Sequence, residues 1–326
     1  MAGYIIPPPP PKPDFSASHS KLTKLQYGDS HTPKEELDKL KSDIQSEYLA
    51  AFQKTVAMHE VFLIRLTSHP VLREDQNLQV FLEYDQDLSY KTKTKKDKAL
   101  GFLKGVAKSM DSTLQKHVDE DEFFEGQKSF IFHYLRMIRD AQAASVAKIR
   151  SRNAIVTSMN KVGVTMVHLA NTQHASHLMS EMMRKTGQVH VPAAQHQMKL
   201  AAKEDLKMSD LLKYYRADSE AAKDLMSRRV KALHTMKTTE AALAQAKLKS
   251  KKVLEAQDAA TAAKDRYESI TKSAKDELKV YKKRRIAAFR KGLIQYTQCQ
   301  IRQSREMYSL MKSTLSSLKE MQAPAN

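Results

Sequence analysis

The sequence is poor in the features that close disulfides or cross membranes. Its 326 residues include one cysteine, Cys299, so no disulfide forms within the chain, which agrees with a reducing compartment. No apolar run approaches the roughly 18 to 20 residues that a membrane-spanning helix needs. The opening residues run straight into Pro7–Pro11 without a basic start or a long apolar stretch, which argues against a signal peptide.

Glycine is also scarce, and this excludes several catalytic folds. The eight glycines are scattered singly, and there is no Walker loop, GxGxxG or GxSxG motif to cradle a phosphate or present a nucleophile. His174, His177, His190 and His196 have no acidic or thiol neighbours at the spacing of a metal site and are interpreted as helix-surface histidines. The sequence therefore predicts a protein that is not an enzyme and binds no cofactor or metal.

Neither glycine nor proline occurs between Pro192 and Gly292, where strong helix formers fill most positions. One straight helix of that length would reach roughly 150 Å, so the run is expected to fold back on itself. The reversal is placed in the lysine-dense stretch 247–252, beyond which an apolar seam restarts with spacings of three and four. The seam comprises Val253, Ala256, Ala260, Ala263, Tyr267, Ile270, Ala274, Leu278 and Tyr281. This pattern predicts a long antiparallel hairpin whose second arm approaches about 70 residues and 100 Å.

Two further long helices are expected upstream. One begins at Pro33, after Thr32, and runs to about Ser68; another begins near Val118 and reaches about His168. Residues 171–196 are expected to be looser, with Pro192 ending or kinking the preceding helix. The predicted fold is all-α.

Positive charge is concentrated in the helical part. Residues 1–90 hold nine Lys and Arg against thirteen Asp and Glu, a net charge of −4, whereas residues 91–326 hold the remaining 46 and 24, a net charge of +22. Such an excess favours a polyanionic partner, either an anionic membrane or a nucleic acid. Because no base-reading motif interleaves the lysines, nucleic acid is not the expected partner.

A short amphipathic helix is predicted over residues 98–114. Its apolar face comprises Ala99, Leu100, Leu103, Val106, Ala107, Met110 and Leu114, with Phe102 at the edge. Gly101 and Gly105 cost about 1 kcal/mol each, so the helix should be marginal in water and form when its apolar face is covered. A bilayer and a protein surface both fit this pattern; the downstream basic charge favours the bilayer.

Six stretches carry a resemblance that covers nearly the whole chain. They are IIPPPPPKPDF (5–15), EYLAAFQKTVAMHEVFLIRL (47–66), SHPVLREDQNLQVFLEYDQDLS (68–89), EDLKMSDLLKYY (204–215), EAAKDLMSRR (220–229) and KKRRIAAFRKGL (282–293). With them the chain resembles the SNX-BAR sorting nexins, in the subgroup of sorting nexins five and six.

The resemblance implies the helical part of a phox-homology (PX) domain over residues 1–88, a linker with the amphipathic helix over 89–115, and a BAR domain over 116–322. The BAR domain is expected to be an elongated antiparallel three-helix coiled coil that forms a crescent dimer, with a second copy or with sorting nexin one or two. The implied function is sensing or imposing curvature on phosphoinositide-containing early endosome membranes. It serves retromer-linked retrograde transport to the trans-Golgi network.

Three sets of residues are hypothetical interaction sites. The membrane-inserting residues are Phe102, Leu103, Val106 and Met110. Head-group contacts are Lys104, Lys108, Lys148, Arg150, Arg152, Lys247, Lys249, Lys251 and Lys252, each of which also fits a solvated helix face. A groove for cargo-receptor tails, which the resemblance alone implies, includes Tyr48, Leu49, Phe52, Val56 and Glu60 on its helical side.

The sequence departs from the family pattern in two places. The three-stranded sheet of the family's PX domain would precede Tyr4 and is missing here, as in a shortened isoform or an incomplete gene model, so phosphoinositide and cargo binding by the PX part are open. The segment 187–201 is longer than in the family by about a heptad, and the second BAR helix is expected to bend there. The alternative function is a structural coiled-coil adaptor or an inhibitory short isoform that pairs with other sorting nexins without binding membrane itself.

Overall fold

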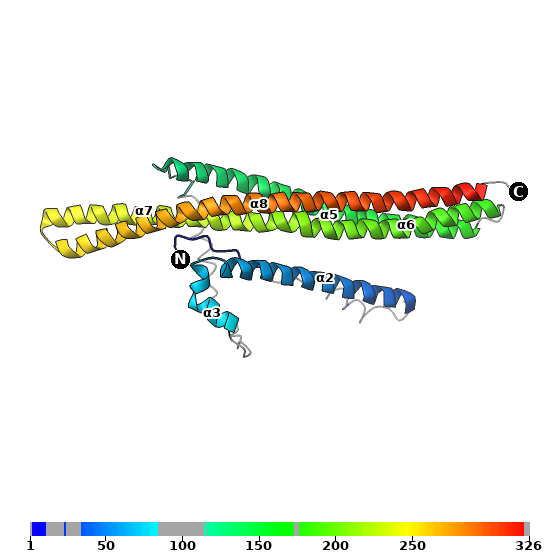
Figure 1. Cartoon of the computed structure of the whole chain (residues 1–326), viewed down its shortest axis with the longest axis horizontal. Helices are drawn as coiled ribbons and strands as arrows, with labels where there is room; N and C mark the ends of the chain where they lie inside the picture. The colour runs from blue at the N-terminus through cyan, green and yellow to red at the C-terminus, as the bar shows by residue number, and fades with distance from the viewer. Residues whose placement is uncertain are drawn as a thin grey trace. The chain divides into compact units, whose positions relative to one another are not determined.

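The computed structural model describes residues 2–10, 23, 34–83, 114–115, 117–172 and 176–322, without the side chains of 34–40, 42, 43, 46, 47 and 50. Every regular element in this part of the chain is helical (Figure 1). The elements are α2 (Lys34–Thr67), the 3₁₀ turn η1 (Leu72–Glu74), α3 (Gln76–Glu83), α5 (Glu122–Thr172), α6 (His177–Glu204), the π-helical turn η3 (Asp205–Ser209), α7 (Asp210–Lys249) and α8 (Val253–Gln322). The all-α prediction is confirmed.

The chain divides into two compact units. The first unit comprises Met1–Val118 with Asp224–Ala274, and the second comprises Asp119–Lys223 with Lys275–Asn326. Helices α7 and α8 therefore each contribute a segment to both units.

In the second unit α5, α6 and the later part of α8 lie side by side (Figure 1). Acidic side chains begin α5: Asp121 accepts a hydrogen bond from the Phe123 amide at 3.0 Å, and Asp119 accepts one from the Asp121 amide at 3.1 Å. These carboxylates satisfy amide groups and oppose the helix dipole at its positive end. The inward face of α5 carries buried Phe124, Ile131, Leu135 and Ile138 at helical spacing. Ile138 packs in a cluster with Leu212 and Tyr215 of α7.

Residues 177–196 are helical, so the expectation of a looser segment is wrong there. The alternative that a helix ends at Pro192 is also wrong, and the alternative that Pro192 kinks the helix stays a prediction. Helix α6 begins after Ser176, whose hydroxyl accepts a hydrogen bond from the Met179 amide at 3.3 Å, and continues through Pro192 to Glu204. A proline inside a helix costs about 3 kcal/mol. Close packing offsets that cost: a Cβ added to Gly187 would lie 2.8 Å from the Gly163 carbonyl oxygen of α5, so the two backbones touch. Buried Ala193 and Ala194 follow directly.

The first unit contains the end of the α7–α8 hairpin that carries its reversal, and the reversal lies where it was predicted. α7 ends at Lys249 and α8 begins at Val253, with Ser250 and Lys252 at φ of 49° and 54°. All nine residues of the predicted seam on α8 are buried or half-buried. The helix is 70 residues long, and at 1.5 Å per residue it spans about 105 Å.

The N-terminal segment also packs in the first unit. Arg228 of α7 donates a hydrogen bond from Nη2 to the Tyr4 carbonyl oxygen at 2.7 Å, and the rings of Tyr4 and His69 meet edge to face at 5.4 Å. Deeper in the hairpin, Arg229 donates to the Tyr267 hydroxyl at 2.9 Å and to Thr271 at 3.2 Å. The hydrogen bonds of Arg229 therefore join α7 to α8 and add to the apolar seam between the two helices.

Candidate interaction surfaces

The hairpin tip presents the basic residues expected to contact lipid head groups. Lys247, Lys249, Lys251 and Lys252 are all exposed. Among the described residues, Glu255 forms an exposed ion pair with Lys252 at 3.3 Å, which is worth little in water. The structure therefore brings the four predicted lysines together at one end of the hairpin.

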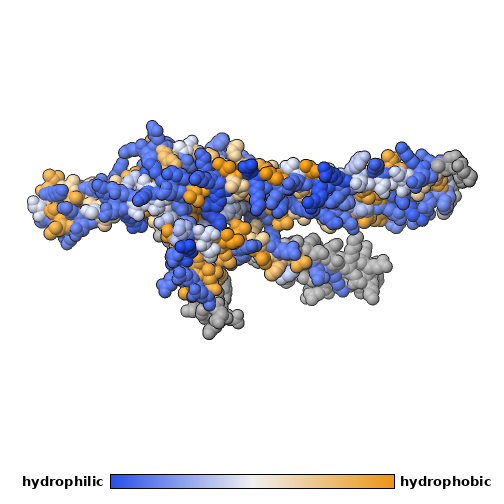
Figure 2. All heavy atoms as spheres, viewed as in Figure 1, coloured by the Kyte–Doolittle hydropathy of each residue, from blue (hydrophilic) through white to orange (hydrophobic). Residues whose placement is uncertain are grey.

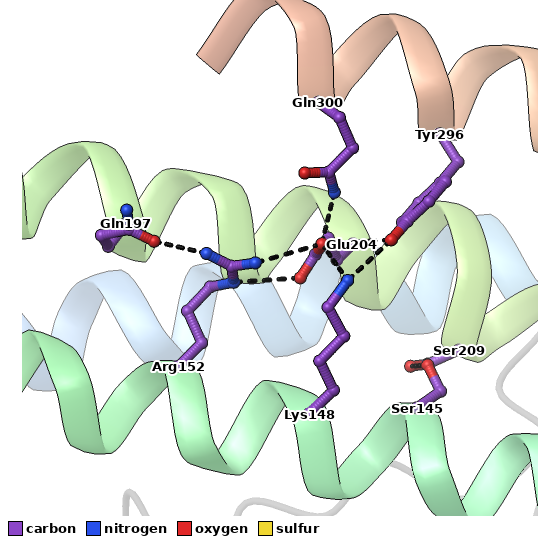
Figure 3. Close-up of polar contacts among 8 residues, drawn as sticks. All are labelled: Ser145, Lys148, Arg152, Gln197, Glu204, Ser209, Tyr296 and Gln300. Carbon is purple, nitrogen blue, oxygen red and sulfur yellow. Dashed lines mark hydrogen bonds and ion pairs between the residues drawn. The ribbon is translucent and has the colours of Figure 1, made fainter. Parts of the chain in front are cut away.

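The predicted cations of α5 are divided between two environments. Arg150 is exposed, but Lys148 and Arg152 turn onto Glu204 of α6 (Figure 3). Lys148 Nζ lies 2.7 Å from Glu204 Oε1, and Arg152 Nε lies 3.1 Å from Glu204 Oε2. Both cations have an internal anionic partner, so they are less suited than Arg150 to lipid phosphate.

Glu204 is the centre of a polar cluster that sequence reasoning missed. Its side chain is 3% exposed. Gln300 of α8 donates to Oε1 of Glu204, while the Tyr296 hydroxyl accepts from Lys148 at 2.7 Å (Figure 3). Arg152 also donates to Gln197 of α6. The cluster therefore joins α5, α6 and α8 at the start of the π-helical turn, and the sequence carried no signal of it because its members lie far apart along the chain.

The pKa values in this cluster follow from burial opposed by pairing. Burial alone would raise the pKa of Glu204. Hydrogen bonds from Lys148 and Gln300 and the charge of Arg152 outweigh it, so the pKa lies below its ordinary value of 4.5. Burial likewise opposes the charge of Lys148, but its hydrogen bonds to Glu204 and Tyr296 raise its pKa overall. Both groups are therefore charged at neutral pH.

The residues implied for a cargo groove lie on α2. Tyr48, Leu49, Phe52 and Val56 are each about half exposed, as are Val61 and Ile64 further along the helix, and Glu60 is exposed. Large apolar side chains at this density on one helix are typical of a surface that another segment covers.

A second row of exposed apolar residues follows α8 in the second unit. Its members lie at multiples of seven residues: Val280, Ile294, Ile301, Tyr308 and Leu315. Helix α5 carries a shorter row with the same period, made of Ile155, Val162 and Leu169. A seven-residue apolar period is the signature of a helix face that packs on another helix.

A cavity of about 410 Å³ lies between α6 and α8 in the second unit. Its lining includes His196, Leu200, Met307 and Tyr308 together with Gln303, which is buried. Neither polar atom of the Gln303 side chain has a hydrogen-bond partner in the described part of the chain. A buried amide in this state is costly and is a point where substitution can raise stability.

The predicted membrane-inserting residues Phe102, Leu103, Val106 and Met110, with Lys104 and Lys108, lie outside the described residues. No helix in the described ranges is both long and apolar enough to span a bilayer.

Comparisons with known proteins agree on one family. The family described as "Vps5 C terminal like" matches residues 99–317, and the PX domain family matches residues 1–85. Human sorting nexin-6 is 42% identical over 324 residues, covering 97% of this chain and 78% of that protein. Human sorting nexin-32 is 39% identical over 322 residues, covering 98% of this chain and 79% of that protein.

A solved structure of the N-terminal I-BAR domain of D. discoideum IBARa aligns with a TM-score of 0.41 and 14% identity, over 64% of this chain and 94% of that one. The family matches and the curated relatives together cover almost every residue. The chain belongs to the sorting nexins that combine PX and BAR domains, which act in endosomal trafficking as adaptors and not as enzymes.

Proposed function

We propose that this chain acts as a dimeric scaffold that senses or shapes the curved membrane of early endosomes and their tubules. In this role it supports retromer-linked retrograde transport to the trans-Golgi network. The proposed lipid partner is an anionic, phosphoinositide-containing surface. The proposed protein partner is a second copy of the chain or a sorting nexin of type one or two.

The exposed seven-residue row on α8 is the observation that carries the dimer. Five large apolar side chains along one helix face, each about half exposed or more, remain uncovered by the chain's own described elements. Fully burying one such side chain contributes about 1.5 to 3 kcal/mol, so half-burial of five supports association by about 4 to 7 kcal/mol before the costs of binding. A helix of a partner chain supplies that cover.

Replacing Ile294 and Ile301 together by Asp tests the dimer. Two unpaired charges buried in a helix–helix interface would be costly. The variant is therefore expected to be monomeric by light scattering while keeping wild-type helical content. Thr261→Asp, an exposed site earlier on α8, adds charge to the same helix and is the matched control. A wild-type chain that is monomeric alone and with sorting nexin one would refute the dimer.

Membrane binding is supported by the net charge of residues 91–326 and by the exposed lysines of the tip. Each lysine near an anionic surface contributes about 1 kcal/mol. Reversing Lys247, Lys249, Lys251 and Lys252 to Glu is expected to abolish tubulation of phosphatidylserine vesicles. Reversing Arg150 should weaken binding less, because one charge is lost instead of four. Unchanged tubulation after the fourfold reversal would contradict this assignment.

The segment 98–114 is proposed to add a wedge, with Phe102, Leu103, Val106 and Met110 in the outer leaflet. Replacing these four residues by Ser should reduce vesicle tubulation while leaving dimerisation unchanged. If the wild-type chain binds a partner but never sediments with vesicles, the membrane-independent adaptor is the better description.

The half-exposed apolar face of α2 favours a second function, the binding of an extended peptide from a receptor tail. Tyr48, Phe52 and Val56 would supply apolar contacts and Glu60 a negative charge. A display library of cytosolic receptor tails should yield peptides whose binding is lost in Phe52→Asp. Selection of the same peptides by wild type and variant would refute it.

A further inference from the structure

Two leucines at the hairpin tip are more exposed than any other large apolar residue in the described ranges. Leu248 is 86% exposed and Leu254 is 80% exposed, followed by Val118 at 77%. A single exposed leucine is ordinary on a protein surface. Two exposed leucines at the same turn, among four exposed lysines, form a small amphipathic surface.

The turn that carries these leucines is held by the backbone. The Lys251 amide donates to the Ala246 carbonyl oxygen at 3.2 Å, and the Ser250 amide donates to Lys247 at 3.3 Å. Ser250 and Lys252 take left-handed φ values, which end α7 and start α8 within three residues. Leu248 lies in the last turn of α7 and Leu254 in the first turn of α8. Both therefore lie at the end of the hairpin, because α7 ends at Lys249 and α8 begins at Val253. Figure 1 shows α7 turning back into α8 at this end.

The hairpin does not need these leucines for its own packing. Its seam near the tip is made by Leu243 and Ala246 of α7 with Val253 and Ala256 of α8, all half-buried. Figure 2 shows hydrophobic side chains at this end of the hairpin beside hydrophilic ones. The two leucines are available to an external partner.

The chemistry of the surroundings favours lipid over protein. Residues 247–252 include four lysines and no acid, and lysine is depleted in the buried centres of protein interfaces. At a bilayer surface the same side chains lay their apolar stems along the acyl boundary and keep their charged ends at the phosphates. Nucleic acid offers phosphates but no apolar phase for leucine.

We propose that the hairpin tip, residues 247–254, is a membrane-inserting wedge. Leu248 and Leu254 enter the acyl boundary of an anionic bilayer while Lys247, Lys249, Lys251 and Lys252 contact its head groups. This inference rests on the proposed membrane function and adds an apolar anchor to it. The tip then binds the membrane through the buried leucine side chains as well as through the charges of the lysines.

The chain has no tryptophan, so one substitution creates a single fluorescent reporter. Leu248→Trp and Leu254→Trp are expected to shift their emission to the blue, and to be quenched by lipids brominated on the acyl chains, when phosphatidylserine vesicles are added. Pure phosphatidylcholine vesicles should produce neither change. Ala241→Trp, an exposed site about two turns earlier on α7, is the matched control and should not respond.

A second variant measures how much the anchor contributes. Leu248→Ser with Leu254→Ser keeps all four lysines, and because both sites are exposed its helical content and melting should match the wild type. Its affinity for phosphatidylserine vesicles is expected to fall about tenfold or more, since each leucine leaves an apolar phase. That fall should persist as salt is raised, whereas the contribution of the lysines should fade.

Two results would overturn the wedge. Tip reporters that stay unquenched while the chain sediments with vesicles would show binding elsewhere, leaving the proposed function intact. Loss of association with a sorting nexin partner in the double serine variant, with vesicle affinity unchanged, would make the tip a protein contact. A chain that never sediments with anionic vesicles refutes the proposed membrane function itself.

Discussion

Replacing Glu204 by Ala removes a carboxylate that joins α5, α6 and α8 in the second unit. Arg152 then keeps its charge at a site where its side chain is only 17% exposed, while Lys148, at 48%, regains water easily. Gln300 loses its acceptor in the same step. Breaking a buried ion pair by removing one partner costs about 3 to 5 kcal/mol, and the exposure of Lys148 places the expected loss near the lower end, about 3 kcal/mol.

Urea unfolding followed by circular dichroism measures this loss. Protein concentration must be held fixed because association shifts the apparent stability. Glu204→Gln keeps an acceptor without the charge and should lose less, about 1 to 2 kcal/mol. A double-mutant cycle with Arg152→Met should give a coupling of about 1 to 3 kcal/mol. A loss below about 1 kcal/mol in Glu204→Ala would refute the view that the cluster stabilises the bundle.

The same residue gives a pH dependence with a definite sign. The pKa of Glu204 is lower in the folded chain than its ordinary value of 4.5. A carboxylate of this kind contributes stability that is fully present above the unfolded pKa and is lost as pH falls through the folded one. Unfolding free energy should therefore drop below about pH 4.5 more steeply in the wild type than in Glu204→Gln. If the unfolding free energies of the wild type and of Glu204→Gln fell in parallel below pH 4.5, the pH dependence would not come from Glu204.

Three further substitutions test packing. Gly187→Ala should destabilise the chain by about 1 to 3 kcal/mol, because its Cβ would lie 2.8 Å from the Gly163 carbonyl oxygen. Gly126→Ala is the control: nothing lies within 4 Å of its added Cβ, so a gain of about 0.5 to 1 kcal/mol is expected from helix propensity. Equal effects at both glycines in urea melts would disprove the close helix contact. Gln303→Leu should raise the unfolding free energy at fixed protein concentration by about 1 to 3 kcal/mol, since its buried amide has no partner in the described residues. No gain would show that water in the adjoining cavity already satisfies the amide.

Several parts of the fold were predictable because they depend on local pattern. The seam from Val253 to Tyr281 repeats every three or four residues, and such a period places side chains on one helix face whatever surrounds it. The turn at residues 247–252 was predictable because polar, lysine-rich residues interrupt that period. Pro192 misled the prediction because its local cost is offset by contacts with α5, which sequence neighbours do not reveal.

The sequence by itself determined the helical class, the reversal of the hairpin, the distribution of charge and the family. Only the tertiary structure decided which cations are paired internally and which side chains remain uncovered. Glu204 meets Arg152 and Gln300 across separations of 52 and 96 residues, and the exposure of Leu248 depends on where α8 returns past α7. Helical periodicity is a property of the chain within a few turns, whereas pairing and burial are set by helices that approach from distant parts of the sequence.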